Sequence, residues 1–263
     1  MTLLALRGVS RRYAGLLAVD RVDLAIPQGG VHAVIGPNGA GKTTLFNLIS
    51  GLVAPSTGTI ALDGRDITRL AADARARLGL ARTFQTARLF GAMTVLENAL
   101  TGLHPRLAAP FYAIVLRSPR FVREERHALA RAREALALVG LQKRAEDRAA
   151  ALSYGEGRRL EIARAMAGAP RLLLLDEPAA GLNPAETVAL GVLIRTITET
   201  GTTVLLVEHD MKFVMSLSDT VTVLNFGRRL FHGPPAVART DPAVIAAYLG
   251  QKVADRLNAA APE

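Results

Sequence analysis

The chain has 263 residues and half of them are hydrophobic, so it can bury the core of one large domain, with or without an inserted subdomain. Cysteine is absent, which excludes a disulfide framework and thiol chemistry. The formal net charge is +9, but the basic residues are nearly all arginines scattered along the chain, and tryptophan is absent, so we expect no nucleic-acid partner.

Membrane-spanning segments are not expected. The N-terminus lacks the charged start and the long apolar region of a signal peptide. The longest apolar run, 107–116, is interrupted by Pro110 and is too short to cross a bilayer. We therefore expect the chain to be cytoplasmic and to meet a membrane only through other proteins.

The N-terminal region is predicted to form strands. Residues 3–9 and 18–26 show short alternating apolar patterns, and the second pattern ends at the turn residues 27–30. Residues 58–64 predict a further strand closed by an Asp-Gly turn.

Residues 36–44 match the phosphate-binding loop pattern G-x-x-x-x-G-K-[ST] without a mismatch. The apolar run before them predicts a buried strand and the run after them a helix, which is the context this loop requires. Its glycines let backbone N–H groups turn toward a phosphate, and Lys42 is expected to reach the terminal phosphates while the Thr43 hydroxyl holds Mg²⁺. The expected nucleotide-binding residues of this loop are Gly36, Pro37, Asn38, Gly39, Ala40, Gly41, Lys42, Thr43 and Thr44.

The region 92–150 changes character and is predicted to be helical. Thr94 and Glu97 form a capping-box pattern that opens one helix. Residues 124–139 predict a long amphipathic helix that Gly140 ends.

Strands return after residue 170, at 172–175, 203–207 and 220–224. Helices are predicted between them, one opened by Asn183 with proline and glutamate behind it, and a last one after Asp241. Alternating strands and helices predict an α/β fold with a largely parallel sheet covered by helices on both faces.

Two carboxylates end the strand predicted at 172–175. Asp176 is placed to hold Mg²⁺, directly or through water, and Glu177 to polarise an attacking water. Many strands end in acidic residues, so these two carboxylates indicate a nucleotide site only because a complete phosphate loop lies upstream.

Ser153 opens a further predicted helix. Ser153 can cap it, Glu156 can close a capping box, and Gly155 leaves the backbone open to an anion. A second helix end suited to phosphate is explained if it faces the ATP held by another subunit.

With these three signals in order, the sequence from residue 3 to residue 250 resembles the ATP-binding subunits of ABC transporters. The resemblance implies a P-loop NTPase core with an N-terminal antiparallel β-subdomain and an inserted α-helical subdomain at about 87–157. It also implies a single ABC ATPase domain over 1–250, followed by a C-terminal tail at 251–263.

The resemblance also assigns roles by position. Tyr13 matches the aromatic residue that stacks on adenine, and Gln85 the glutamine that touches Mg²⁺ and water. Ser153 and Gly155 match the signature that completes the partner's ATP site, and the loop 180–183 the segment that communicates across the dimer. The residues matching the magnesium aspartate, the catalytic glutamate and the switch histidine are Asp176, Glu177 and His209.

The sequence departs from this family at two places. Tyr154 and Glu156 replace the usual glycine and glutamine of the signature, and Asn183 replaces the aspartate that usually ends the communicating loop. Since the serine, the second glycine and the catalytic carboxylate remain, we expect ATP hydrolysis to be intact and the coupling between subunits to differ.

Several stretches are most similar to the ATPases of branched-chain amino acid importers, namely 82–90, 93–98, 157–164, 176–184, 207–211 and 247–250. The segment 104–127 has the place of an insertion in the helical subdomain, packed against permease or core or left as a solvated loop. This likeness implies transmembrane permease subunits, a second ATPase in a head-to-tail homo- or heterodimer, an extracytoplasmic binding protein, and a peripheral location on the cytoplasmic face of the membrane.

Other classes remain open from the sequence. The same motifs occur in ATPases of urea or amide importers and of lipid or lipopolysaccharide exporters. Ribosome-acting relatives usually carry two cassettes, and DNA-repair relatives a long coiled coil between loop and signature; neither is found here. A protein that only binds nucleotide is disfavoured by the intact Lys42, Asp176, Glu177 and His209.

Overall fold

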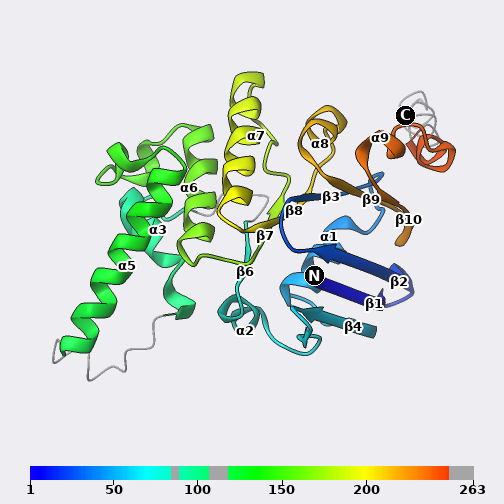
Figure 1. Cartoon of the computed structure of the whole chain (residues 1–263), viewed down its shortest axis with the longest axis horizontal. Coiled ribbons are helices and arrows are strands. Elements are labelled where there is room, and N and C mark those ends of the chain that lie inside the picture. The colour runs from blue at the N-terminus through cyan, green and yellow to red at the C-terminus, as the bar shows by residue number, and fades with distance from the viewer. Residues whose placement is uncertain (84–88, 107–117, 249–263) are drawn as a thin grey trace, which may run out of the picture. The chain divides into compact units, whose positions relative to one another are not determined.

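The computed structural model describes residues 1–83, 89–106 and 118–248 (Figure 1). The chain divides into two compact units. The first unit combines Met1–Ala72 with the chain from Thr203 onward, and the second unit is Asp73–Thr202. Gln85, the middle of the predicted insertion 104–127, and the predicted tail 251–263 lie outside the described residues.

An antiparallel sheet forms one layer of the first unit, as the resemblance implied, with the strand order β2-β1-β4-β5. Leu4 faces Ile26 and Leu6 faces Leu24, and these side chains are buried because alternate residues of each strand point into the core. The four strands are β1 (Thr2–Tyr13), β2 (Leu16–Pro27), β4 (Thr57–Leu62) and β5 (Arg65–Asp66).

The other sheet of the first unit is mostly parallel. Strands β8 (Thr203–Val207) and β9 (Thr220–Asn225) both pair in parallel with β3 (Val31–Ile35), and β10 (Arg228–Gly233) adds an antiparallel edge. Every residue of β3 and β8 is buried, which explains their uninterrupted apolar runs. Its helices are α1 (Lys42–Ser50), α8 (Met211–Leu217), α9 (Pro235–Ala238) and a last helical segment, 242–248.

The second unit holds two parallel strands and the helices around them. Strand β6 (Leu80–Arg82) pairs with β7 (Leu172–Asp176), so both strands end at the same edge. Gly102 lets α3 approach α6 closely, because a Cβ there would lie 1.8 Å from the Arg164 carbonyl oxygen. The α-helices are α2 (Ala72–Arg77), α3 (Val95–Thr101), α5 (Pro119–Leu138), α6 (Tyr154–Ala167) and α7 (Pro184–Glu199), and the short 3-10 turns are η1 (His104–Arg106), η2 (Gln142–Arg144) and η3 (Ala149–Ala151).

The predicted helix starts are confirmed. Capping boxes with both reciprocal hydrogen bonds open α3 at Thr94, α6 at Ser153 and α7 at Asn183. Asp241 accepts hydrogen bonds from the amides of Ala243 and Val244 at the last helical segment.

Helix α5 begins earlier than the sequence pattern predicted. Ser118 caps it and Pro119 occupies its first turn, five residues before the predicted start at residue 124. Five α-helices and strands, each of six residues or fewer, were not predicted from the sequence: α2, β5, β6, β10 and α9. Among the described helices, none is both long enough and apolar enough to span a membrane.

Two histidines of the first unit are held in environments that disfavour their charged forms. His32 on β3 is 3% exposed, and burial lowers its pKa below 6.5, although the Gly29 carbonyl and Asp219 act in the opposite direction. Burial also lowers the pKa of His232, and the charges of Arg229 and His32 add to this effect.

These lowered pKa values predict an acid-sensitive fold. The unfolded chain protonates both histidines as the pH falls through 6.5, whereas the folded chain keeps them neutral, so stability present above that pH is lost below it. The free energy of unfolding should fall by up to about 1.4 kcal/mol per pH unit for the buried His32, and by less for His232, whose exposed ring is screened by solvent. Urea unfolding at about pH 7.5 and about pH 5.5 measures this loss. His32→Gln should reduce it, and an unchanged pH dependence in that variant would contradict the assignment.

Candidate functional site

The predicted phosphate loop leaves β3 and enters α1 as expected. Gly36, Gly39 and Gly41 have φ angles of 152°, 77° and 97°, which only glycine adopts without strain. A Cβ on Gly36 would lie 2.2 Å from the Leu224 carbonyl oxygen, and one on Gly41 would lie 2.4 Å from that of Ala18. Both positions therefore require glycine for space as well as for backbone conformation.

Lys42 folds back across this loop. Its Nζ donates hydrogen bonds to the carbonyl oxygens of Gly36 and Pro37, at 2.7 and 2.9 Å. Gly41, the N-cap of α1, has no side chain to cap the helix, and Thr43 in the first turn is exposed. Uncapped amides, an ammonium group and an exposed hydroxyl at one helix end are the groups that bind a nucleotide phosphate.

The first glycine of the loop is anchored by the C-terminal part of the chain. The Gly36 amide donates a hydrogen bond to the phenol oxygen of Tyr248. Burial of this phenol raises the pKa of Tyr248 to about 12. Since its carbonyl also binds Lys42, Gly36 has a structural role that the sequence analysis did not foresee. The proximity of Tyr248 to the loop could not be read from the sequence because the two are far apart along the chain.

His209 lies at the same edge of the sheet as the phosphate loop. Val207 is paired with Val34 across two parallel strands, so the residues that follow both strands emerge side by side. The imidazole is 64% exposed, with its Nδ1 3.7 Å from a carboxylate oxygen of Glu208. Glu208 is itself buried and accepts a hydrogen bond from the His209 amide, which fixes the backbone from which the imidazole projects.

Tyr13 ends β1 with its side chain partly exposed. The guanidinium of Arg11 lies 4.6 Å from the centre of its ring, a cation–π contact that covers one face.

In the second unit, the predicted magnesium aspartate is held by an arginine. Nη2 of Arg82 lies 2.8 Å from Oδ2 of Asp176, and both side chains are less than a tenth exposed. The contact exists because β6 and β7 are parallel and end together. Arg82 belongs to a stretch that we used only for its likeness to amino acid importers, so its ion pair was missed.

Glu177 follows Asp176 in a strained conformation. Its φ angle is 47°, in the left-handed region that few non-glycine residues adopt, and its carbonyl accepts a hydrogen bond from Ala180 at 3.2 Å. Such strain is often found where a side chain must be aimed for chemistry.

Two predicted motifs, the signature helix and the loop 180–183, lie in contact. The hydroxyl of Tyr154 donates to the Ala180 carbonyl at 2.9 Å and accepts hydrogen bonds from the Arg158 guanidinium. A Cβ on Gly155 would lie 2.5 Å from Oε1 of Glu186, so a larger residue there would require the Glu186 side chain to move. Tyr154, a departure from the family pattern, therefore joins the signature helix to the loop of its own chain.

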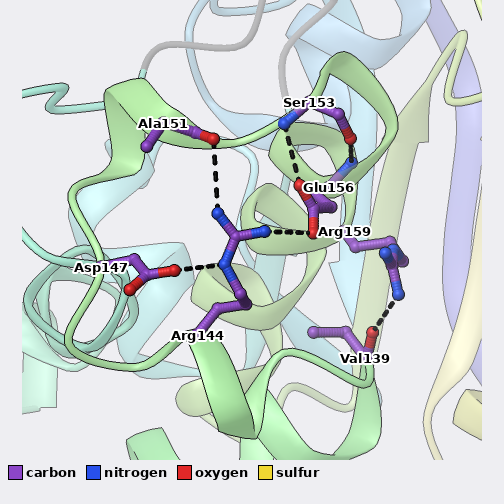
Figure 2. A network of polar contacts seen from close by, with 7 residues as sticks. All are labelled: Val139, Arg144, Asp147, Ala151, Ser153, Glu156 and Arg159. Carbon is purple, nitrogen blue, oxygen red and sulfur yellow. Dashed lines mark hydrogen bonds and ion pairs between the residues drawn. The ribbon is translucent and has the colours of Figure 1, made fainter.

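Ser153 and Glu156 are joined in a polar network (Figure 2). The Glu156 carboxylate accepts hydrogen bonds from the Ser153 amide at 2.9 Å and from Nη1 of Arg144 at 2.7 Å. The hydrogen bond from the Ser153 backbone is the largest cause that lowers the pKa of Glu156, so this side chain is ionised beside the helix N-terminus.

Each of the two units carries an oxygen donor of the kind that magnesium prefers. Within the described ranges no group of three or more His, Cys, Asp or Glu residues could hold a metal by itself. Magnesium is usually bound by one or two carboxylates together with substrate phosphates. The second unit offers the carboxylate of Asp176, and the first unit separately offers the exposed hydroxyl of Thr43. Gln85, the third expected ligand, lies outside the described residues.

Comparison with known protein families gives two matches. Residues 19–180 match the family described as ABC transporter. Residues 228–254 match the family described as branched-chain amino acid ATP-binding cassette transporter.

Individual relatives and structures agree with these matches. The chain is 47% identical to the high-affinity branched-chain amino acid transport ATP-binding protein LivG of Salmonella typhimurium, and 48% identical to BraF of Pseudomonas aeruginosa. Each alignment covers 95% of this chain and 98% of the relative. The fold is similar to a crystal structure of the ADP conformation of an ABC transporter cassette, with a TM-score of 0.84, 29% identity, and coverage of 95% of this chain and 99% of that one. A nucleotide-free cassette gives a TM-score of 0.82 at 28% identity, over 94% of this chain and 99% of that one.

Proposed function

This chain belongs to the ATP-binding, ATP-hydrolysing subunits of ABC transporters, and we propose that it powers the uptake of branched-chain amino acids through separate permease subunits. The similarity to LivG and BraF along 95% of the chain carries the proposal. The match of residues 228–254 to the family named for branched-chain amino acids supports it independently.

In the proposed reaction, water attacks the γ-phosphorus of ATP and the bond to the β–γ bridging oxygen breaks, which releases ADP and phosphate. Lys42 and the amides of the phosphate loop hold the phosphoryl oxygens, Glu177 orients the water and accepts its proton, and His209 contacts the γ-phosphate. Asp176, Thr43 and Gln85 would hold Mg²⁺, which neutralises phosphate charge when bound.

Arg82 bears directly on that metal-binding role. Because its guanidinium contacts the Asp176 side chain at 2.8 Å, the buried carboxylate is already oriented at the strand end by this ion pair. Asp176 has a second carboxylate oxygen in addition to the one that contacts Arg82, so the ion pair leaves acceptor sites on the group.

The assembly that we propose is a head-to-tail pair of ATPase subunits, identical or related, on the cytoplasmic face of the membrane. Each ATP would lie between the phosphate loop of one subunit and the Ser153 helix end of the other. Permease subunits would receive the motion and an extracytoplasmic binding protein would deliver the substrate. We further propose that residues 1–250 act as one ABC ATPase domain with the helical subdomain at about 87–157, followed by a tail at 251–263.

The cargo is tested by uptake in cells whose only copy of this chain carries Lys42→Ala. Loss of the lysine removes the ammonium from the phosphate loop, so uptake of labelled leucine should fall to the level of cells without the chain. Uptake of labelled urea, measured in parallel, should not change.

Other results would point elsewhere. If urea uptake falls and leucine uptake does not, the chain serves a urea or amide importer. If neither changes while the purified protein hydrolyses ATP, the cargo is wrong and lipid or lipopolysaccharide export becomes the leading alternative.

A further inference from the structure

The N-terminus of helix α6 is expected to meet an anion, yet it carries a negatively charged side chain, that of Glu156. Glu156 stands at the third position of α6, and its carboxylate binds the amide of Ser153. In the assembly proposed above, Ser153 and the first amides of α6 receive the γ-phosphate of an ATP held by the partner subunit. An uncompensated carboxylate beside those groups would repel the phosphate at short range, where water screens charge least.

The structure places one arginine against this carboxylate. Arg144 ends the turn η2, twelve residues before Glu156, and its Nη1 lies 2.7 Å from Oε1 of Glu156. The Arg144 side chain is 33% exposed and that of Glu156 is 20% exposed. The pair is therefore partly shielded from water, which weakens the solvent screening between the two charges.

Arg144 is itself fixed from two other sides, as Figure 2 shows. Its Nε contacts the Asp147 carboxylate, and its Nη2 donates to the Ala151 carbonyl at 3.3 Å. The guanidinium is thereby aimed at Glu156 and loses little rotational freedom when it binds the carboxylate.

We propose that Arg144 is a positioning residue for ATP at the signature helix: it neutralises Glu156 and holds that carboxylate in the capping box, so that the helix end can receive a γ-phosphate. This inference rests on the proposed function, because it needs an ATP presented by a partner subunit. It also gives a reason why glutamate can stand where the family usually has glutamine.

The neighbouring Arg159 offers a matched control. It lies three residues after Glu156 on the same helix, and its Nη1 donates to the carbonyl oxygen of Val139 at 3.1 Å (Figure 2). Replacing Arg159 by glutamine removes the same charge from the same region without changing the contacts of Glu156.

The test is a double-mutant cycle on the tagged full-length chain, purified from its own cells with the subunits that accompany it. ATP hydrolysis is measured against ATP concentration, so the experiment needs no knowledge of the cargo. Arg144→Gln should lower kcat/KM for ATP by about tenfold, while Arg144→Lys and Arg159→Gln stay within about twofold of wild type. Glu156→Gln alone should stay near wild type, because glutamine also closes a capping box.

The decisive variant is Arg144→Gln combined with Glu156→Gln, which should return kcat/KM to within about twofold of wild type. If Arg144 only stabilised the turn through Asp147 and Ala151, adding Glu156→Gln could not restore kcat/KM. The thermal unfolding temperature without nucleotide would then be lowered equally in Arg144→Gln and in the double variant. An active wild type without rescue therefore overturns this inference, whereas a wild type that does not hydrolyse ATP overturns the proposed function.

Discussion

Replacing Glu177 by glutamine is expected to lower ATP turnover by about 10²–10⁴-fold while ATP binding is retained. The substitution keeps the size of the side chain and removes the carboxylate that would accept the proton of the attacking water. Lys42 and the phosphate loop lie elsewhere in the chain and keep their hydrogen bonds, so nucleotide affinity should be preserved. With ATP bound and not hydrolysed, the pair of ATPase subunits should accumulate in its closed form.

This prediction is checked by steady-state ATP hydrolysis, by equilibrium ATP binding, and by the oligomeric state with and without ATP. Glu199→Gln, at the exposed end of α7, is a control for the loss of one carboxylate on the same unit. Turnover at the wild-type rate in the Glu177 variant would rule out the assignment of Glu177.

Replacing Arg82 by leucine is expected to destabilise the protein by about 3–5 kcal/mol, because it leaves the carboxylate of Asp176 buried without its partner. Neither side chain of this pair is more than a tenth exposed, so water cannot compensate the remaining charge. Chemical denaturation of the nucleotide-free chain measures the loss.

A second arginine–aspartate pair of the same unit is the control. Arg77 and Asp73 are 2.6 Å apart on α2, but their side chains are 56% and 63% exposed. Arg77→Leu should therefore change the free energy of unfolding by less than about 1 kcal/mol. If the two substitutions lowered the free energy of unfolding equally, burial of the Arg82–Asp176 pair would not increase its contribution to stability.

Local patterns were sufficient for much of the fold. The strand, loop and helix around Lys42 and the capping boxes at Thr94, Ser153 and Asn183 are confirmed, because each depends on residues within a few positions of one another. The failures occur where the local pattern is too short to decide and a tertiary contact forms the element. Strand β6 has three residues and too short a pattern to be recognised, and it is a strand only because β7 lies beside it.

The sequence by itself determined the family, the phosphate loop, the acidic end of β7 and the positions of the helix starts, since these follow from residue types at fixed short spacings. Only the tertiary structure decided which polar and charged groups contact one another. Arg82 reaches Asp176 through the parallel register of two strands, Tyr154 reaches Ala180 across a helix and a loop, and Arg144 reaches Glu156 because the chain reverses between them. Ion pairs and hydrogen bonds of this kind depend on distances of a few ångströms between residues far apart along the chain, and no sequence spacing specifies those distances.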